Sequence, residues 1–237
     1  MPLIGNLGGV QLAASGGIDL ARRAVADIGA DAIFIHLNPL QEAVQPEGET
    51  DWRGVLGAIE TVVGVLEVPV MVKEVGAGIG PDVAQRLFDA GVHAVDIAGL
   101  GGTNWTRIEA ARREDAALFE PFLDWGLPTV DALRAVRTAC PNARLIASGG
   151  VENGLDAAKA LWLGAALVSM AGPVLRALTG DGRGAPDGAA AVHVIERWKS
   201  QLRLALFLTG APDLPSFAGK PGHVGGPHQR AIVPPNR

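Results

Sequence analysis

The sequence is short of several residue types, and each shortage excludes a class of protein. One cysteine, Cys140, excludes a disulfide framework and fits a reducing compartment. The formal net charge is −5 and no basic run is present, which argues against nucleic-acid and membrane-surface partners. No run of about 18 apolar residues exists, so no membrane span is expected. The first residues lack a basic segment and a long apolar stretch, so they do not predict a signal peptide. We therefore expect a cytoplasmic protein.

Short apolar runs and glycine are plentiful by contrast. The chain has 237 residues, 48% of them hydrophobic, which suffices for a large core. Each run consists mainly of Val, Ile, Leu or Ala and continues into polar or Gly-rich residues. Six such runs cover residues 2–9, 31–38, 68–76, 93–102, 143–150 and 165–172. Continuous rather than alternating apolar runs indicate strands covered on both faces. Segments with helical spacing separate them, and Pro81 and Thr129 are suited to a first helical turn and an N-cap. This alternation predicts a parallel sheet.

The residues that follow the apolar runs favour a TIM (β/α)8-type barrel over a doubly wound sheet. A barrel builds its active site from several loops at the carboxyl ends of its strands. Functional-looking side chains follow nearly every run here, and no G-x-G-x-x-G follows the first one. Only about six βα units are visible. We expect an incomplete α/β barrel over residues 1–210, with the first two units missing. A Pro/Gly-rich tail that buries no core is expected over 211–237.

Two Gly-rich turns, "ASGGVENG" and "MAGP", follow the last two apolar runs. Glycine lets backbone N–H groups approach a phosphate, and such turns after the last barrel strands form a known phosphate site. The alternative is a pair of tight turns without a ligand. The candidate phosphate residues are Ser148, Gly149, Gly150, Met170, Ala171 and Gly172.

Lys73 ends the apolar run "VMVK". A lysine that points into a barrel mouth is costly unless it meets an anion, and the N1–C2=O edge of a reduced flavin is such an anion. The alternative is a salt bridge to a neighbouring carboxylate such as Glu74. In "GLGGTNWTRIEAARR", Thr103 can hydrogen-bond a cofactor, and Trp105 and Glu109 share a face if the segment is helical. The alternatives are loop packing for Trp105 and a solvated pairing with Arg112 or Arg113 for Glu109.

The stretch "HLNPLQEAVQPEGETD", residues 36–51, is rich in polar groups for a connector. His36 and Asn38 point the same way if extended, and both can donate hydrogen bonds to an anion. The carboxylates that follow suit magnesium, which is usually held by one carboxylate and a ligand phosphate. One histidine without a cysteine cluster does not suit zinc. The alternative is a polar surface loop.

Together with "VKEVGAGI", "VDIAGLGGTNW", "DWGLPTVDAL" and "ASGGVENGLDAAKALWLGA", this stretch resembles the type 2 isopentenyl-diphosphate isomerases from Asn6 to about Gly210. The resemblance implies a (β/α)8 barrel that binds FMN and magnesium. It also implies the interconversion of isopentenyl and dimethylallyl diphosphate in isoprenoid biosynthesis, by proton transfer with a reduced flavin that NADPH primes.

The resemblance also assigns roles to residues. His36 and Asn38 would contact the diphosphate, Gln41 the reacting alkene, and Glu42 magnesium. Trp105 and Glu109 would close over the substrate. The flavin contacts would be Asn6, Lys73 and Thr103, with the flavin phosphate at Ser148, Gly149, Gly150, Met170, Ala171 and Gly172. The candidate catalytic residues are His36, Gln41, Trp105 and Glu109.

Members of that family are longer at the front, where they carry two more strands, a basic diphosphate-binding segment and a Thr-Gly-Gly turn. A misplaced start or fragment, a barrel completed by a second polypeptide, and an inactive relative are the alternatives. We expect a homo-oligomer or a complementing polypeptide, because open sheet edges are poorly tolerated. Two other functions remain open: an FMN-dependent oxidoreductase of the hydroxy-acid oxidase type, whose His/Arg pair is not found, and a non-catalytic subunit.

Overall fold

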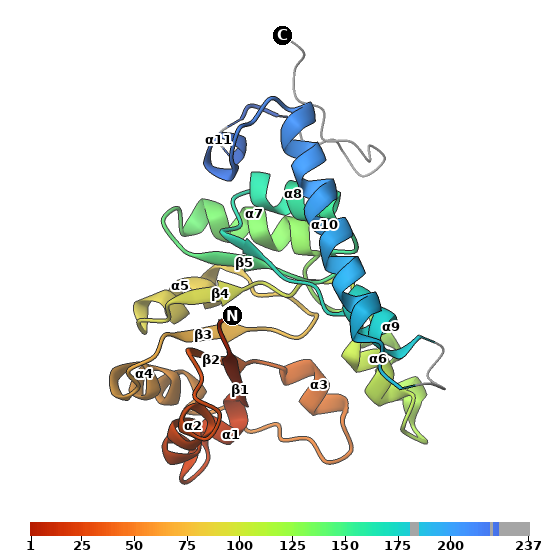
Figure 1. The fold of residues 1–237 in the computed structure, drawn as a ribbon. Helices are drawn as coiled ribbons and strands as arrows, with labels where there is room; N and C mark the ends of the chain where they lie inside the picture. Colours follow the sequence, from red (N-terminus) through yellow and green to blue (C-terminus); the bar gives the residue numbers. More distant parts are fainter. Residues whose placement is uncertain (181–184, 219, 223–237) are drawn as a thin grey trace. The chain divides into compact units, whose positions relative to one another are not determined.

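The computed structural model describes residues 1–180, 185–218 and 220–222. The chain forms two compact units, Met1–Gly150 and Val151–Arg237. Strands and helices alternate along both units, as Figure 1 shows, so the predicted β/α pattern is confirmed.

The strands lie within the apolar runs of the sequence and are shorter than those runs. Five belong to the first unit: β1 (Ile4–Gly8), β2 (Ala32–His36), β3 (Val70–Lys73), β4 (Ala94–Asp96) and β5 (Leu145–Ala147). They pair in parallel and in chain order. The second unit contains β6 (Leu167–Val168). Parallel strands connected by helices are the architecture of a partial TIM-type barrel.

The connecting elements cover the predicted helical segments. In the first unit they are α1 (Gly9–Ala13), α2 (Gly17–Ala26), α3 (Pro39–Val44), α4 (Val55–Val65), α5 (Pro81–Asp89), α6 (Trp105–Ala110), the 3-10 helix η1 (Ala116–Phe122) and α7 (Thr129–Ala139). The second unit has α8 (Gly154–Trp162), α9 (Gly172–Thr179), α10 (Gly188–Leu208) and α11 (Leu214–Ala218). Pro81 occupies the first turn of α5, as expected.

Thr129 does not cap α7, so that prediction is wrong. It is the first residue of the helix, and its side chain makes no capping hydrogen bond. Its hydroxyl instead contacts the carbonyl oxygens of Leu100, Ser148 and Gly149, at 3.3, 3.1 and 2.7 Å. The side chain therefore joins the turns that follow β4 and β5.

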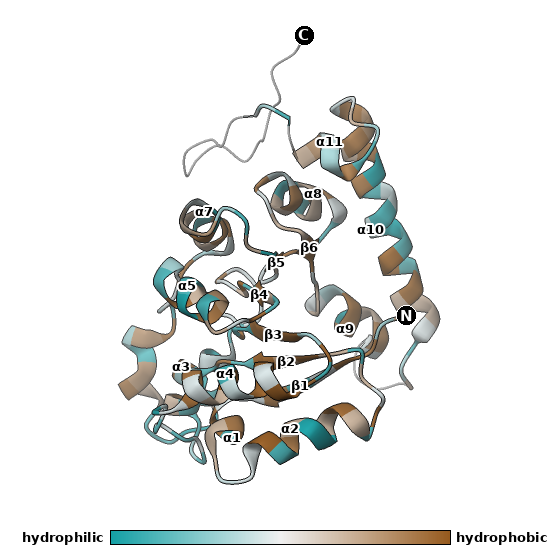
Figure 2. Ribbon diagram, turned by 90° about the vertical axis from the view of Figure 1, so that its left-hand side faces the viewer, coloured by the Kyte–Doolittle hydropathy of each residue, from teal (hydrophilic) through white to brown (hydrophobic). Residues whose placement is uncertain are grey.

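The two faces of the first unit's sheet differ in composition. Alternate residues point to opposite faces of a strand. On one face Ile33, Val72 and Val95 are fully buried, and α2, α5 and α7 contact β1, β4 and β5. The strands are strongly hydrophobic in Figure 2. The opposite face carries a separate apolar cluster formed by Ala32, Phe34, Met71, Ala94 and Ile146. We call this the inner face, and the strands end on it in polar residues.

The second unit has its own core, and part of the expected tail belongs to it. Phe217 in α11 is only 6% exposed and packs with Ala158 and Ala205. The indole nitrogen of Trp162 donates to the carbonyl oxygen of Lys220 at 2.8 Å. Ala211 and Phe217 of the expected tail therefore belong to a core, contrary to the expectation, while residues 219 and 223–237 lie outside the described residues. Within the described chain, no helix is both long and apolar enough to cross a membrane.

Candidate functional site

A layer of polar side chains lies at the carboxyl ends of the strands, on the inner face. His36 pairs in register with Lys73, and Lys73 with Asp96. The Ser148 hydroxyl reaches the same layer and donates to Asp96 Oδ1 at 2.7 Å. On the other side, His36 Nδ1 lies 3.4 Å from Asn6 Oδ1. The first unit thus brings together four predicted site residues: Asn6 within β1, His36 and Lys73 at the ends of β2 and β3, and Ser148 after β5.

Lys73 is half-buried in this layer. Its Nζ donates to the backbone oxygen of Glu74 at 3.1 Å. The Glu74 carboxylate turns away into its own loop, and the described ion pairs do not include Lys73. The salt bridge considered as the alternative is therefore not formed. Burial lowers the pKa of Lys73, while the charges of Asp96 and Glu74 act to raise it.

Asp96 is the member of the layer that the sequence analysis missed. It is 5% exposed, and burial raises its pKa to about 6 against the opposing effects of Ser148, Lys73 and the Ala98 N–H. An acidic residue inside "HAVDIAGL" was a detectable signal. A buried carboxylate at the end of a strand is costly without partners, so such a residue marks a candidate site.

His36 is predominantly uncharged at neutral pH. Burial lowers its pKa, and the charge of Lys73 lowers it further, while Glu42 has the opposite effect. Because Asn6 Oδ1 only accepts, a hydrogen bond to it would place the proton on Nδ1 and leave Nε2 as an acceptor. In that tautomer the ring would donate to Asn6 and present Nε2 as an acceptor.

The backbone conformation and close packing at Gly149 and Gly150, after β5, require glycine. Gly149 and Gly150 adopt φ values of +92° and +79°. A Cβ on Gly149 would lie 2.1 Å from the carbonyl oxygen of Gly99, and one on Gly150 would lie 2.5 Å from that of Gly101. The two turns therefore pack backbone against backbone. The N–H groups of Gly149 and Gly150 have no acceptor within the described chain, which leaves them available to an anion.

The other half of the predicted phosphate site belongs to the second unit. Met170 and Ala171 follow β6, and α9 begins at Gly172. The turns after β5 and β6 belong to different compact units, so a phosphate site formed by both turns stays a prediction.

The stretch after β2 folds into a buried hydrogen-bonded group rather than a surface loop. Asn38 and Glu42 are buried at 4% and 8% exposure, which argues against that alternative. Asn38 Nδ2 donates to Gln41 Oε1 at 3.3 Å and to Glu42 Oε1 at 3.0 Å. Glu42 Oε2 accepts from the N–H of Glu49 at 2.8 Å. Both amide protons of Asn38 are thus directed at Gln41 and Glu42, which leaves its oxygen as the group still to be satisfied.

This group has the chemistry that magnesium prefers. Asn38 Oδ1 is buried and has no hydrogen-bond partner among the described residues. The Glu42 carboxylate lies beside it, and each of its oxygens accepts one hydrogen bond and retains a lone pair. A carboxylate and an amide oxygen are hard donors of the kind that bind Mg²⁺. The described residues contain no cluster of three His, Cys, Asp or Glu, which a site using substrate phosphate and water does not need.

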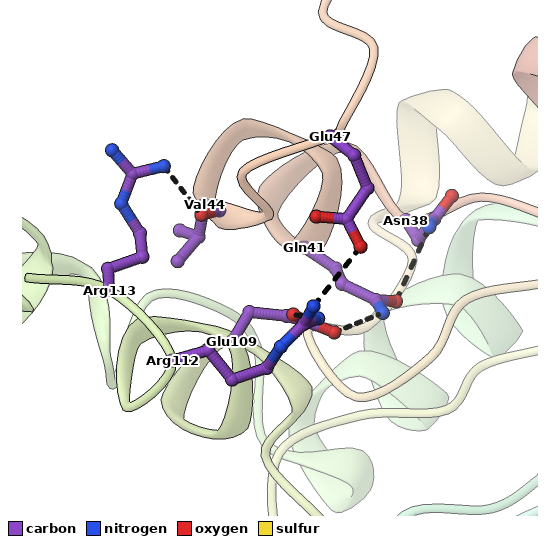
Figure 3. Close-up of polar contacts among 7 residues, drawn as sticks. All are labelled: Asn38, Gln41, Val44, Glu47, Glu109, Arg112 and Arg113. Carbon is purple, nitrogen blue, oxygen red and sulfur yellow. Dashed lines mark hydrogen bonds and ion pairs between the residues drawn. The ribbon is translucent and has the colours of Figure 1, made fainter.

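Figure 3 shows that α3 and α6 are joined by side chains. Gln41 Nε2 donates to Glu109 Oε1 at 3.4 Å. Arg112 binds Glu109 at 2.5 Å and Glu47 at 3.2 Å. Glu109 does pair with Arg112, as the alternative stated, but it is 6% exposed rather than solvated. The structure therefore places two candidate catalytic residues, Gln41 and Glu109, in contact.

The remaining candidates lie on or before α6. Trp105 is the first residue of this helix and is 43% exposed. It lines, with Gln41, a cavity of about 10 Å³, which is room for one water molecule at most. Thr103 is exposed in the preceding loop. Neither of these side chains has a contact that places it in the polar layer.

Comparison with known proteins assigns the class of protein. The model of the FMN-dependent dehydrogenase family matches residues 39–220. A solved structure of mandelate oxidase with (S)-4-hydroxymandelic acid has the same fold, with a TM-score of 0.59 and 18% identity over 86% of this chain and 61% of that one. The chain belongs to the FMN-dependent dehydrogenase family, and its fold is part of a TIM-type barrel.

The curated relatives of this chain share the name of one enzyme within this class. The chain is 54% identical to the isopentenyl-diphosphate delta-isomerase of Stutzerimonas stutzeri (strain A1501) over 215 residues, which are 90% of this chain and 60% of that protein. It is 50% identical to the enzyme of the same name from Pseudescherichia vulneris, over 90% of this chain and 61% of that protein. The chain therefore spans about 60% of the length of these relatives.

Proposed function

We propose that this chain interconverts isopentenyl and dimethylallyl diphosphate, as the names of its relatives indicate for those proteins. The observation that carries the proposal is the pair of buried residues Asn38 and Glu42, which is linked through half-buried Gln41 to buried Glu109. A polar surface loop would leave these side chains in water and would not require hydrogen bonds among them. They support a site that binds a metal at one end and orients a substrate at the other.

FMN is the cofactor implied by the family, and the residues present fit it. Lys73 and Asn6 would face the flavin ring, and the N–H groups of Gly149 and Gly150 would bind its phosphate. Thr103, Met170, Ala171 and Gly172 stay expected flavin contacts, on the family resemblance alone. When bound and reduced by NADPH, FMN would supply acid–base chemistry for the proton transfer.

The chain's own residues would position the diphosphate and its alkene. Glu42, with Asn38 Oδ1, would hold Mg²⁺ against the diphosphate. His36 would contact the diphosphate through a ring N–H. Gln41, held by Glu109, would orient the alkene, and Trp105 would cover it. An unactivated alkene is a poor base, so its protonation demands a site from which water is excluded.

Catalysis is tested by following the substrate directly. The purified chain, with FMN, NADPH and Mg²⁺, is incubated with isopentenyl diphosphate in D₂O, and the dimethylallyl product is followed by NMR. A parallel sample adds the part of the Stutzerimonas stutzeri relative that this chain does not match, because a homo-oligomer or a complementing polypeptide is also proposed. Conversion with deuterium incorporation is expected in at least one sample.

Two outcomes would contradict the proposal. Oxidation of mandelate or another 2-hydroxy acid without isomerisation would assign the chain to the hydroxy-acid oxidase type. A protein that takes up no FMN in either sample would be a non-catalytic subunit.

We expect Glu42→Gln to weaken divalent-cation binding at least about tenfold, since an amide replaces the charged ligand. Mn²⁺, observed by electron paramagnetic resonance in the presence of inorganic pyrophosphate, serves as the probe. Glu60→Gln, an exposed change on α4, is the matched control and should bind Mn²⁺ as the unmodified chain does. Equal Mn²⁺ affinities for Glu42→Gln and Glu60→Gln would show that Glu42 is not a metal ligand.

A further inference from the structure

Asp96 has a role that the residue assignments above leave open. Its carboxylate is buried on the inner face between Lys73 of β3 and Ser148 after β5. Register partners in a parallel sheet point to the same face, so Asp96 and Lys73 present their side chains side by side. A buried carboxylate costs stability unless it has partners, and its hydrogen-bond partners are Ser148 and the N–H of Ala98, with Lys73 as the neighbouring charge.

Two hydrogen bonds fix the carboxylate in place. Oδ1 accepts from Ser148 Oγ at 2.7 Å and from the N–H of Ala98 at 3.2 Å. Ala98 has a φ of +41°, and among the described residues it is the only non-glycine residue with a positive φ. An L-residue pays strain in this conformation, and such strain concentrates at functional sites. The turn after β4 is thus held in a strained form that directs an N–H group at Asp96.

We propose that Asp96 is a positioning residue for Lys73: its buried carboxylate, fixed by Ser148, attracts the neighbouring ammonium group and orients it at the end of β3, beside the Ser148-Gly149-Gly150 turn. The inference rests on the proposed FMN site, because Lys73 and this turn are its expected flavin contacts. Asp96 would act through Lys73 and Ser148 and would not touch the substrate.

Electrostatics agrees with this arrangement. The titratable groups that face Lys73 are His36 from β2, the adjacent Glu74, and Asp96 from β4. His36 is neutral near pH 7, and the Glu74 carboxylate is occupied by backbone N–H groups of its own loop. Asp96, whose pKa is about 6, is largely ionised at neutral pH and is the first of the two charges that raise the pKa of Lys73.

The test measures Lys73 itself. The chain has four lysines, Lys73, Lys159, Lys199 and Lys220, so reductive ¹³C-methylation gives few signals, and Lys73→Arg identifies the relevant one. In Asp96→Asn, which has the same shape and can still accept from Ser148, we expect the pKa of Lys73 to fall by about 1 pH unit or more. Ser148→Ala should leave it unchanged, because Asp96 is ionised in either protein where Lys73 titrates.

Asp131→Asn, an exposed change on α7, is the matched control and should not move the Lys73 titration. A Lys73 pKa in Asp96→Asn equal to that of the Asp131→Asn control would overturn the proposal. An equal fall in Ser148→Ala would also overturn it, since the effect would then reflect packing and not charge. Should Asp96→Asn not fold, Asp96→Ser provides the neutral variant with a retained hydrogen-bonding group.

FMN titration separates this inference from the proposed function. If both hold, Asp96→Asn should weaken FMN binding at least about tenfold, because its Lys73 cation is less firmly held. A chain that takes up no FMN would defeat the proposed function, while the methyl-lysine titration would still decide whether Asp96 controls Lys73.

Discussion

Gly149→Ala is expected to lower the free energy of unfolding by about 3 kcal/mol or more. The added Cβ would lie 2.1 Å from the Gly99 carbonyl oxygen and 2.8 Å from Thr129 Oγ1, so the backbone of one turn has to move. A φ of +92° adds strain for any L-residue. Urea denaturation of the full chain, followed by circular dichroism, measures the loss.

The matched control for Gly149→Ala is Gly57→Ala. Gly57 lies within α4 and has open space around its Cβ position. Alanine there should raise the unfolding free energy by about 0.5–1 kcal/mol, because glycine weakens a helix interior. Equal stabilities for the two variants would show that the turns after β4 and β5 do not pack backbone against backbone as described.

Glu74→Ala is expected to cost about 3 kcal/mol, because one carboxylate oxygen serves most of a loop. Glu74 is 5% exposed, and its Oε2 accepts from the N–H groups of the residues that follow it. The donors are Val75, Gly76, Ala77 and Gly78, at 2.7, 2.6, 2.5 and 3.2 Å. Alanine leaves these donors without their acceptor, and thermal and urea unfolding should both register the loss.

Glu74→Gln retains an acceptor oxygen and should cost about 1 kcal/mol. Exposed Glu60→Ala is the control and should be nearly neutral. Burial raises the pKa of Glu74 despite the four N–H donors, so the folded chain retains this proton to higher pH than the unfolded chain does. Its contribution to stability therefore falls as pH rises through the folded pKa, and this trend should be absent in Glu74→Gln. A Glu74→Ala variant as stable as Glu60→Ala would contradict the loop's dependence on this carboxylate.

The strands and the polar strand ends were predictable from sequence because both are local patterns. His36 and Lys73 end continuous apolar runs, and a polar residue there is conspicuous. Asp96 escaped notice because it lies inside such a run, "HAVDIAGL", and only the register of β4 against β3 shows that it stands beside Lys73. Pairing between strands is a tertiary property that the composition of one strand does not contain.

Side chains whose partners are distant in sequence were the least predictable. Thr129 is of a residue type that is common at N-caps, but its hydroxyl donates to the carbonyl oxygen of Ser148, 19 residues away in sequence. Glu109 meets Gln41 across 68 residues, and the sequence alone favoured a solvated charge. Phe217 lies in a Pro/Gly-rich segment, yet it finds a hydrophobic core. In each case a tertiary contact determined the outcome over local propensity.

The side chains that join α3 to α6 have a consequence for how these two segments can move. Glu109 and Arg112 on one side, and Gln41 and Glu47 on the other, close a ring of contacts, so neither segment can swing outward alone without breaking it. Glu42 is carried by α3 and Trp105 by α6. Under the proposed function, Mg²⁺ binding at Glu42 and uncovering of the substrate by Trp105 would therefore require the same displacement of these two segments.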